Sequence, residues 1–491
     1  MKNLTQSVYS FENLRKGDFL YVDKTEFLWE LIRPSNAMYF FSRPRRFGKS
    51  LTLSTLEAIF RGKRELFQGL AIYDKPYDWE EYPVIHLDFG DCAVDSAARL
   101  TRYLDDAINS IAKAHEIMLD KCELSSRFSE LISAMDKGKG VVVLVDEYDK
   151  PLLNMLDDAH AMREMLPVMK GFYSSIKTSA AHERFVFVTG VTKFCHVSLF
   201  SDLNNLQDIS LDNRYATMLG YTQAEFESYF SEWIATTEAR QSLSHERFLA
   251  RVKSWYDGYR FEETAESVYN PVSLACFFEN GGKFNNYWFA TGTPSFLMKL
   301  IKQRKIAMEQ VVTEPVNAFA FNAFEIDDVP LLTLLFQTGY VTIKSAVVKR
   351  EKVYYRLDFP NREVSESFNV YLLDAYAKSS KNEVATFCDH LSDAIEEGNL
   401  AKFQKALEVF FAGIPYDVHH RSEANFQNIF FAIFKLMGYD IHAESQTSDG
   451  RIDAVLETDD SVYLFEFKLN GDDSALEQIR RKEYFKPYLL S

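Results

Sequence analysis

Cysteine is scarce in this sequence, which excludes a disulfide-rich or zinc-ribbon protein. Of 491 residues only 5 are cysteine: Cys92, Cys122, Cys195, Cys276 and Cys388. They are odd in number and widely spaced, and no two of them form a CxxC pair. This pattern is typical of reduced thiols, so we expect a cytoplasmic protein.

Long apolar runs and an excess of positive charge are also missing. No stretch approaches the roughly 18 uninterrupted apolar residues of a membrane span, and residues 1–10 lack a signal-peptide core, so we expect no membrane partner. Lys and Arg total 55 against 71 Asp and Glu, a net charge of −16. Contact with DNA or RNA would therefore need local basic patches or bound metal. The 47% hydrophobic and 26% charged content is that of a globular protein.

Alternating strand-like and helix-like patterns fill the first part of the chain. The strand-length apolar runs are residues 37–41, 84–89, 141–145 and 185–189, and helical spacing follows at 51–60 and 100–114. This alternation predicts an α/β domain with a parallel sheet covered by helices on both faces.

The pattern changes after Gly220. Thr222 and Glu225 form a capping box, which predicts a helix start. The chain then reads as mainly helical to about residue 416, with strand-like pieces at 340–347 and 352–357. The last part predicts a helix at 424–436, strands at 454–457 and 462–467, and a helix from 474. We expect three domains, at residues 1–220, 221–416 and 417–491.

A phosphate-binding loop is predicted directly after the first apolar run. Backbone amides at a helix start bind phosphate oxygens, the Lys49 ammonium reaches the β- and γ-phosphates, and the Ser50 hydroxyl ligates Mg²⁺. The candidate binding residues are Arg45, Arg46, Phe47, Gly48, Lys49, Ser50 and Leu51. The loop departs from GxxxxGK[ST] at one position, because Arg43 replaces the first glycine and Pro44 is left to impose the turn.

Two carboxylates, Asp146 and Glu147, end the apolar strand 141–145. A parallel strand delivers the residues at its carboxyl end to the ligand crevice. Asp146 can hold the water shell of Mg²⁺, and Glu147 is placed to polarise the water that attacks the γ-phosphate. This pair also disfavours a kinase of small molecules, which commonly lacks such a glutamate.

Three further polar residues keep two interpretations each. Thr189 ends the strand 185–189 and is a candidate sensor between nucleotide and attacking water, or else a strand-end threonine with a structural bond. Arg45 and Arg46 could stabilise charge on the γ-phosphate, or could pair with Asp146 or Glu147 when no nucleotide is bound.

Several motifs, in this order, resemble the bacterial AAA-ATPase-like family. They are YVDKT at 21–25, RPRRFGKS at 43–50, DEYDKP at 146–151, LNNL at 203–206, GYT at 220–222, WYDGY at 255–259 and YNP at 269–271. The resemblance covers about residues 3–288, and in this family the missing first glycine is usual. It implies binding of ATP with Mg²⁺, and it leaves open a homo-oligomer in which a neighbouring subunit's arginine completes the site.

A second constellation of charged residues lies near the C-terminus. Asp453 precedes Glu466 by 13 positions, enough for a strand, a turn at 458–460 and a second strand. Glu466 and Lys468 share a strand face, and Asp453 can meet Glu466 across the hairpin. Two carboxylates and a lysine suit phosphodiester hydrolysis, in which the acids hold Mg²⁺ and the metal activates water. The alternative is a solvated Glu–Lys pair without catalytic function.

This arrangement resembles the PD-(D/E)xK nuclease superfamily, and more narrowly the nuclease-like domain that follows this ATPase family. The resemblance implies Asp453 and Glu466 as metal ligands, Lys468 as the catalytic lysine, Glu423 as a helix-borne acid with Glu444 as its alternative, and Gln478 as an orienting residue. Because the chain stops at Ser491, where the family's domain would add strands, we expect a trimmed sheet.

Two functions fit these observations. The first is an ATPase coupled to a metal-dependent nuclease that acts on DNA or RNA. The second is a nucleotide-switched binding or signalling module whose C-terminal domain recognises its partner without cutting it.

Overall fold

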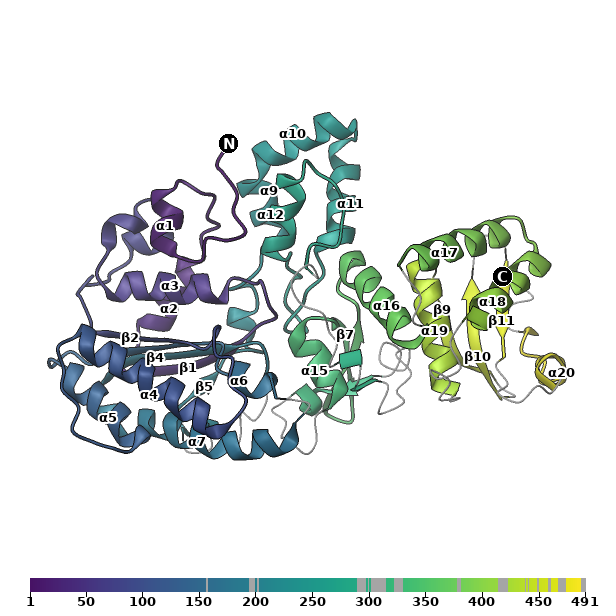
Figure 1. Cartoon of the computed structure of the whole chain (residues 1–491). Helices are drawn as coiled ribbons and strands as arrows, with labels where there is room; N and C mark the ends of the chain where they lie inside the picture. Colours follow the sequence, from purple (N-terminus) through teal and green to yellow (C-terminus); the bar gives the residue numbers. More distant parts are fainter. Residues whose placement is uncertain are drawn as a thin grey trace. The chain divides into compact units, whose positions relative to one another are not determined.

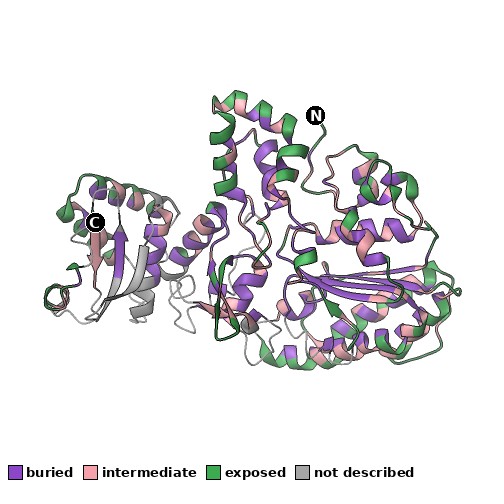
Figure 2. Cartoon of the chain, turned by 180° about the vertical axis from the view of Figure 1, so that it is seen from behind, coloured by how far each residue is buried: buried purple, intermediate pink, exposed green. Residues whose placement is uncertain are grey.

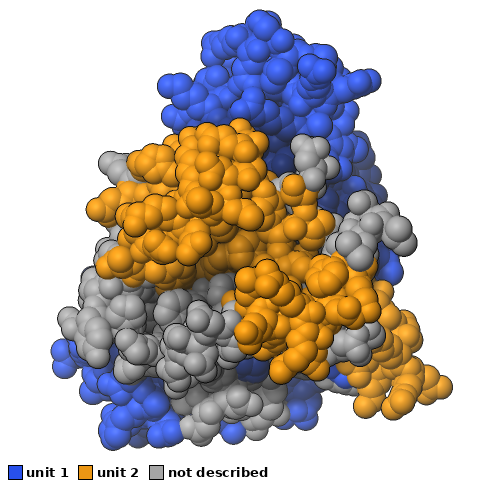
Figure 3. Space-filling model, turned by 90° about the vertical axis from the view of Figure 1, so that its right-hand side faces the viewer, with its two compact units in different colours: residues 1–287, 317–343 blue, residues 288–316, 344–491 orange. Residues whose placement is uncertain are grey.

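The computed structural model describes two compact units of the chain. Unit 1 comprises residues 1–287 and 317–343, and unit 2 comprises residues 288–316 and 344–491 (Figure 3). The described residues are 1–155, 158–193, 199–200, 203–288, 297–298, 300–301, 315–321, 330–377, 381–413, 423–437, 439, 441–447, 450–457, 461–466 and 474–486. The three-domain division at residues 220 and 416 stays a prediction.

A five-stranded parallel sheet forms the centre of unit 1. Its strands are β1 (Ala37–Ser42), β2 (Val84–Asp88), β3 (Val141–Asp146), β4 (Glu183–Gly190) and β5 (Gln207–Asp208). Their spatial order is β2-β3-β4-β1-β5, and every neighbouring pair is parallel. The carboxyl ends of all five strands therefore lie at one edge, with β4 between the strand before the phosphate loop and the strand that ends in Asp146.

Helices cover both faces of this sheet, as the alternating pattern predicts (Figure 1). One face carries α1 (Phe11–Lys16), α2 (Thr25–Ile32) and α3 (Lys49–Phe60), and the other carries α4 (Ala97–Ala114), α5 (Leu124–Met135), α6 (Lys150–Leu153) and α7 (Ala159–Thr178). Every residue of β3 is buried, and Figure 2 shows the same for most of the sheet. Near-continuous apolar strands are the composition that a sheet between two helical layers requires.

A helical subdomain completes much of the rest of unit 1. It contains α9 (Gln223–Tyr229), α10 (Ser231–Gln241), α11 (His245–Tyr256) and α12 (Pro271–Glu279). The predicted capping box is present, with both the Thr222 and Glu225 side chains bonded to backbone amides. Aromatic residues dominate its core, among them Phe226, Phe230 and Phe277. Short 3₁₀ helices lie at η1 (Arg64–Phe67), η2 (Ala71–Asp74), η3 (Ala180–His182), η4 (Asn213–Tyr215) and η6 (Ala318–Phe321).

The end of unit 1 runs directly into unit 2 through one strand. Helix α15 (Leu331–Thr338) ends at Gly339, whose positive φ of 88° suits a glycine cap. Strand β7 (Thr342–Lys349) follows, and it forms a sheet with β8 (Lys352–Asp358) and the two-residue β6 (Val316–Asn317) in the order β6-β8-β7. The strand-like pieces at 340–347 and 352–357 are thus confirmed.

Unit 2 continues with helices around an antiparallel sheet. Its helices are α16 (Arg362–Ala377), α17 (Lys381–Glu396), α18 (Leu400–Gly413), α19 (Glu423–Leu436) and α20 (Ser474–Arg481), and its strands are β9 (Ile441–Thr447), β10 (Gly450–Glu457) and β11 (Val462–Phe465). The sheet order is β11-β10-β9. Rings of Phe403, Phe430 and Phe434 pack against Phe465 on this sheet.

Two expected absences can be stated for the described part of the chain. No disulfide joins cysteines within it. None of its helices combines the length and apolar content that crossing a lipid bilayer requires.

One buried carboxylate lies at the edge of the sheet opposite the phosphate loop. Glu183 begins β4 and is 2% exposed. Among the described residues, none donates a hydrogen bond to either of its carboxylate oxygens. Burial raises the pKa of this carboxyl to about 8. Ionising this carboxyl therefore costs free energy in the folded protein, whereas in the unfolded chain the same ionisation carries no such cost.

We expect the substitution Glu183→Gln to stabilise the protein increasingly as pH rises. Below the ordinary glutamate pKa of 4.5 the carboxyl is protonated in both states, so the gain is small. As pH rises from 4.5 to 8, Glu183 ionises in the unfolded chain but stays protonated in the folded protein. The free energy of unfolding of the parent therefore falls over this range, by on the order of a few kcal/mol, and that of the variant does not.

Thermal unfolding at pH 5 and pH 8 checks this prediction. The matched variant Glu65→Gln removes an exposed carboxylate and should shift the unfolding temperature little at either pH. An equal effect of Glu183→Gln at both pH values would contradict the assignment.

Candidate functional sites

The phosphate loop connects the end of β1 to the start of α3. Two of its residues have left-handed backbone conformations, Arg46 with φ 68° and Gly48 with φ 94°. A Cβ added at Gly48 would meet no atom within 4 Å, so the backbone there faces open space. Arg43 is not among the residues with positive φ. The loop therefore needs a glycine at position 48 and tolerates arginine at the position of the missing first glycine.

The ammonium group of Lys49 lies inside this loop. Its Nζ donates to the carbonyl oxygens of Arg43 and Pro44, both at 3.0 Å. Burial lowers the pKa of Lys49, and the negative charges of Asp146, Glu147 and Asp149 oppose that shift. The lysine thus bonds to neutral carbonyls that an anionic phosphate could replace.

Ser50 and Asp146 meet at the same place. Burial raises the pKa of the Asp146 carboxyl, while a hydrogen bond with the Ser50 side chain and the charge of Lys49 lower it. Lys49, Ser50 and Asp146 therefore lie together at the carboxyl edge of the sheet, and we call this group of three residues the Lys49 pocket. A hydroxyl and a carboxylate beside an open loop of amides are oxygen donors of the kind that Mg²⁺ prefers. The residues present fit a magnesium–nucleotide complex.

Glu147 follows Asp146 in a left-handed conformation, with φ 49°. Its amide donates to Asp146 Oδ1 at 2.9 Å, and its carboxylate lies 3.3 Å from Lys150 Nζ. A non-glycine residue in this conformation stores local strain, a feature that is enriched at functional sites. Glu147 is thus next to the Lys49 pocket, paired with a lysine of its own turn.

Asp149 is a third carboxylate of this site, and sequence reasoning assigned it no role. It is 1% exposed, and it accepts bonds from the amides of Val191 and Thr192 and from the Thr192 hydroxyl. A Cβ at Gly190 would lie 2.5 Å from Asp149 Oδ1. The segment after β3 is therefore fastened to the segment after β4, and the glycine makes this close approach possible.

The remaining predicted residues of the loop differ in their surroundings. Arg45 is exposed, Arg46 and Leu51 are partly exposed, and the charge of Arg45 lowers the pKa of Lys49. Phe47 is buried, with its ring edge-on to Tyr259 and Phe261 at centroid distances of 4.9 and 5.4 Å. Phe47 thus attaches the loop to the segment that contains Tyr259 and Phe261.

Thr189 lies next to β1 within the sheet. Its hydroxyl donates to the Phe41 carbonyl at 2.7 Å, and the side chain is 1% exposed. In this structure the hydroxyl makes a strand-to-strand bond, so a sensor role stays a prediction.

The C-terminal candidate site is built on the hairpin of β10 and β11. Ala454 pairs with Phe465 in the antiparallel register, so one further step places Asp453 at the position opposite Glu466. On the other side of β10, Asp453 lies between the pairs Ile452–Ser445 and Ala454–Ala443, which makes Glu444 its neighbour in register. The register is consistent with the predicted juxtaposition of Asp453 and Glu466, and their role as metal ligands stays a prediction.

One side-chain contact at this site is described. Gln478 of α20 donates from Nε2 to Glu466 Oε1. This bond places the orienting residue suggested by the sequence on the acid that it would orient. Glu423 is the first residue of α19. Lys468 and the predicted turn at 458–460 lie outside the described residues. Within the described ranges, no three His, Cys, Asp or Glu side chains are grouped to hold a metal ion.

Comparisons with known proteins find a match for each of the two regions that contain these candidate sites. A family model described as a predicted AAA-ATPase matches residues 6–200, and one of the PD-(D/E)XK nuclease superfamily matches residues 421–490. An uncharacterized protein in the vnfD 5′ region of Azotobacter chroococcum mcd 1 is 38% identical over 502 residues, covering 99% of this chain and 94% of the relative. The chain belongs to the AAA-ATPase-like family. Its C-terminal region carries the PD-(D/E)XK nuclease superfamily domain.

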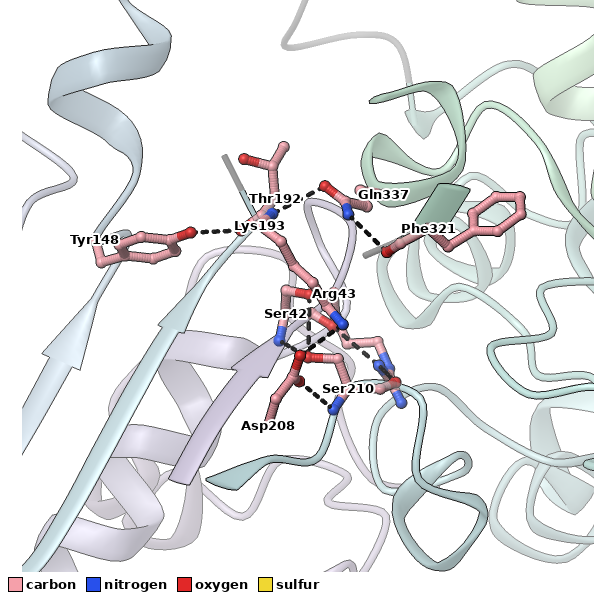
Figure 4. Close-up of polar contacts among 9 residues, drawn as sticks. All are labelled: Ser42, Arg43, Tyr148, Thr192, Lys193, Asp208, Ser210, Phe321 and Gln337. Atoms are coloured by element: carbon pink, nitrogen blue, oxygen red, sulfur yellow. Dashed lines mark hydrogen bonds and ion pairs between the residues drawn. The ribbon is translucent and has the colours of Figure 1, made fainter. Parts of the chain in front are cut away.

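In this AAA-ATPase-like protein, Arg43 fastens the phosphate loop to the next segment of the sheet edge (Figure 4). Its Nη1 donates to the carbonyls of Ser42 and Ser210, at 2.9 and 2.6 Å, and its Nη2 donates to Tyr215 at 3.2 Å. The side chain is 2% exposed. Three carbonyls from two separated segments thus receive bonds from one guanidinium.

Two aromatic rings enclose the same guanidinium. Its Cζ lies 4.2 Å from the ring centroid of Phe41 and 4.1 Å from that of Phe261. Burial lowers the pKa of Arg43 to about 9, and the charge of Asp208 opposes that shift. The arginine stays charged at neutral pH, where cation–π contacts and carbonyl acceptors compensate for its lost hydration.

We expect Arg43→Gly, which introduces the first glycine of the GxxxxGK[ST] pattern, to destabilise the AAA-ATPase-like protein. The change removes three hydrogen bonds and two ring contacts from the buried side of the loop. A lowered unfolding temperature, together with weaker binding of MgATP, is the expected result by calorimetry.

The variant Arg45→Met is the control for stability, because it removes an exposed charge two positions along the same loop. It should change the unfolding temperature far less than Arg43→Gly. Unchanged or raised stability of Arg43→Gly would show that the arginine is not an anchor.

Proposed function

We propose that this protein hydrolyses ATP and that its C-terminal domain is a metal-dependent nuclease controlled by the nucleotide. The observation that carries the first half is the common pocket of Lys49, Ser50 and Asp146 at the carboxyl edge of the parallel sheet. The second half is supported by the register of Asp453 and Glu466 and by the nuclease superfamily match.

The nucleotide would be held by parts of the loop that have matching chemistry. The amides at the start of α3 and the open backbone at Gly48 suit phosphate oxygens. Lys49 would exchange its carbonyl partners for phosphate oxygens, because a charge-assisted bond is stronger than a bond to a neutral carbonyl. Ser50 and Asp146 would hold Mg²⁺, which when bound neutralises charge on the phosphates.

Glu147 would accept the proton of the attacking water. Its carboxylate is paired with Lys150, and separation of the two side chains would free it for the water. Through its bonds to Val191 and Thr192, Asp149 would hold the segments after β3 and β4 together beside the Lys49 pocket.

In the C-terminal domain, Asp453 and Glu466 would hold Mg²⁺, with Glu423 or Glu444 as an additional acid. Gln478 would fix the orientation of Glu466 through the bond already present. Lys468 would position the nucleophile for attack on a phosphodiester of DNA or RNA.

We expect Lys49→Ala and Glu147→Gln to separate nucleotide binding from hydrolysis. Lys49→Ala removes the phosphate contact, so binding of a fluorescent ATP analogue should be lost. Glu147→Gln keeps the binding groups, so it should bind ATP but release phosphate at least about 100-fold more slowly, as for loss of a general base.

Lys137→Ala and Glu164→Gln change exposed residues away from the pocket and serve as matched controls. Both should retain binding and turnover. Phosphate release by Lys49→Ala at the parental rate would place the active site elsewhere.

We expect Glu466→Gln to abolish metal-dependent nicking of plasmid DNA, or cleavage of RNA, by the full chain. The amide is neutral and binds Mg²⁺ poorly, yet it preserves the shape of the side chain. Lys468→Ala should have the same effect, while Glu477→Gln, an exposed neighbour of Gln478 on α20, should cut as the parent does.

Parental protein that binds nucleic acid but never cuts it, with any divalent metal, would favour the module that recognises without cutting.

A further inference from the structure

Residues 331–343 belong to unit 1 although they follow the helical subdomain by more than fifty residues in sequence. They comprise α15, its glycine cap and the first two residues of β7. Two buried polar side chains on this segment, Gln337 and Thr342, point to the nucleotide half of the unit. Gln337 binds the main chain of Lys193, which follows β4. Thr342 binds the main chain of Arg260, whose two neighbours in sequence pack against the phosphate loop.

Gln337 makes the first contact. Its Oε1 accepts the backbone N–H of Lys193 at 2.8 Å (Figure 4). Lys193 follows Thr192, whose amide and hydroxyl are both bonded to Asp149. The residue that Gln337 binds is therefore the direct neighbour of Thr192, which joins the segments after β3 and β4.

Lys193 also connects this junction to the phosphate loop. Its Nζ lies 2.6 Å from Asp208 Oδ2, and Asp208 Oδ1 accepts the amide of Ser210. The Ser210 hydroxyl accepts the amide of Ser42, at the beginning of the loop. A continuous set of polar contacts thus extends from Gln337 to the first residues of the phosphate loop.

Thr342 makes the second contact, from the first residue of β7. Its hydroxyl accepts the amide of Arg260 at 2.7 Å and donates to the Arg260 carbonyl at 3.0 Å. The residues on either side, Tyr259 and Phe261, pack against Phe47 of the phosphate loop. Phe261 also covers the guanidinium of Arg43. Thr342 therefore holds the segment that supports the loop from behind.

Between the loop and this segment lies a small cavity of about 20 Å³, the size of one water molecule. It is lined by Arg43, Pro44, Lys193, Phe321, Phe336 and Gln337. The carbonyls of Arg43 and Pro44 are the two that Lys49 binds in this structure. When phosphate takes over the Lys49 ammonium, these carbonyls would lose their donor, in two residues that also line the cavity.

Strand β7 then leaves unit 1, because the boundary between the units falls after Ile343, its second residue. Any displacement of Thr342 is transmitted along the main chain to Lys344 and the rest of the strand. The hydrogen bonds of Gln337 and Thr342, followed by the main chain of β7, thus form one route from the proposed nucleotide site to unit 2.

We propose that Gln337 and Thr342 are positioning residues that couple nucleotide occupancy of the Lys49 pocket to the conformation of unit 2 through strand β7. The proposal rests on the proposed ATP site, since it needs two states of the phosphate loop. Linkage then requires that nucleotide bind one conformation of residues 331–349 better than the other.

Hydrogen–deuterium exchange of the full chain, with and without a non-hydrolysable MgATP analogue, tests the coupling. In the parent, nucleotide should change the exchange of peptides from β7, β8 and α16. Thr342→Val keeps the shape of the side chain and removes its hydroxyl, so this response should be lost. Thr342→Ser retains the hydroxyl and should respond as the parent does.

Gln337→Met supplies an independent variant in case the threonine change disturbs folding. It removes the acceptor for the Lys193 amide at similar side-chain length, and the nucleotide response of β7 should again be lost. Gln337→Glu keeps an acceptor oxygen and should retain at least part of the response.

The outcomes separate the two proposals. Parental protein that binds the analogue without any change in β7, β8 and α16 overturns the coupling and leaves the ATP site intact, as does a parental response in both Thr342→Val and Gln337→Met. Parental protein that binds no nucleotide overturns the proposed ATP site itself, and the coupling with it.

Discussion

The buried guanidinium of Arg43 is the contact on which the nucleotide pocket depends. It bonds to carbonyls at the end of β1 and in the segment after β5, and it is enclosed by rings from β1 and from the helical subdomain. The GxxxxGK[ST] pattern has a flexible glycine at this position. The arginine replaces that flexibility with attachment from outside the loop.

The hydrogen bonds of Asp149 restrain a second part of the same site. This carboxylate holds the residues after β4 beside those after β3, and Gly190 lets the two chains come close enough. Lys49 lies within the field of Asp146, Glu147 and Asp149. The site therefore holds its cation near three acids, and the phosphates of a nucleotide would add negative charge at this point.

The sheet and the pocket could be predicted from sequence because their signals are local. The apolar residues of β3 end at the acid pair, and the loop lies between a strand and a helix, so chain order alone brought Lys49 and Asp146 to one edge. Strand β5 has two residues and gives no periodic signal. Strand β9 was missed for a related reason, since its sequence IHAESQT contains few apolar residues.

The anchors of the pocket could not be predicted, because they join residues far apart in sequence. Arg43 and Ser210 are 167 positions apart, and Lys193 and Gln337 are 144. No periodicity or motif links such pairs, and a single glutamine on α15 looks like any polar residue of a helix. Asp149 received no role from the sequence, because its partners Val191 and Thr192 follow a different strand, β4.

The discontinuity of unit 1 has a consequence for how the protein can be divided. The matched family model stops at residue 200, yet the folded body takes in a second stretch of chain, residues 317–343. A fragment cut at 200 or 220 would leave the Lys193 amide without the acceptor it has in the intact chain, and one cut at 288 would leave the Lys193 and Arg260 amides both without theirs. The smallest piece that retains these bonds runs through residue 343, and it carries with it the intervening residues assigned to the other unit.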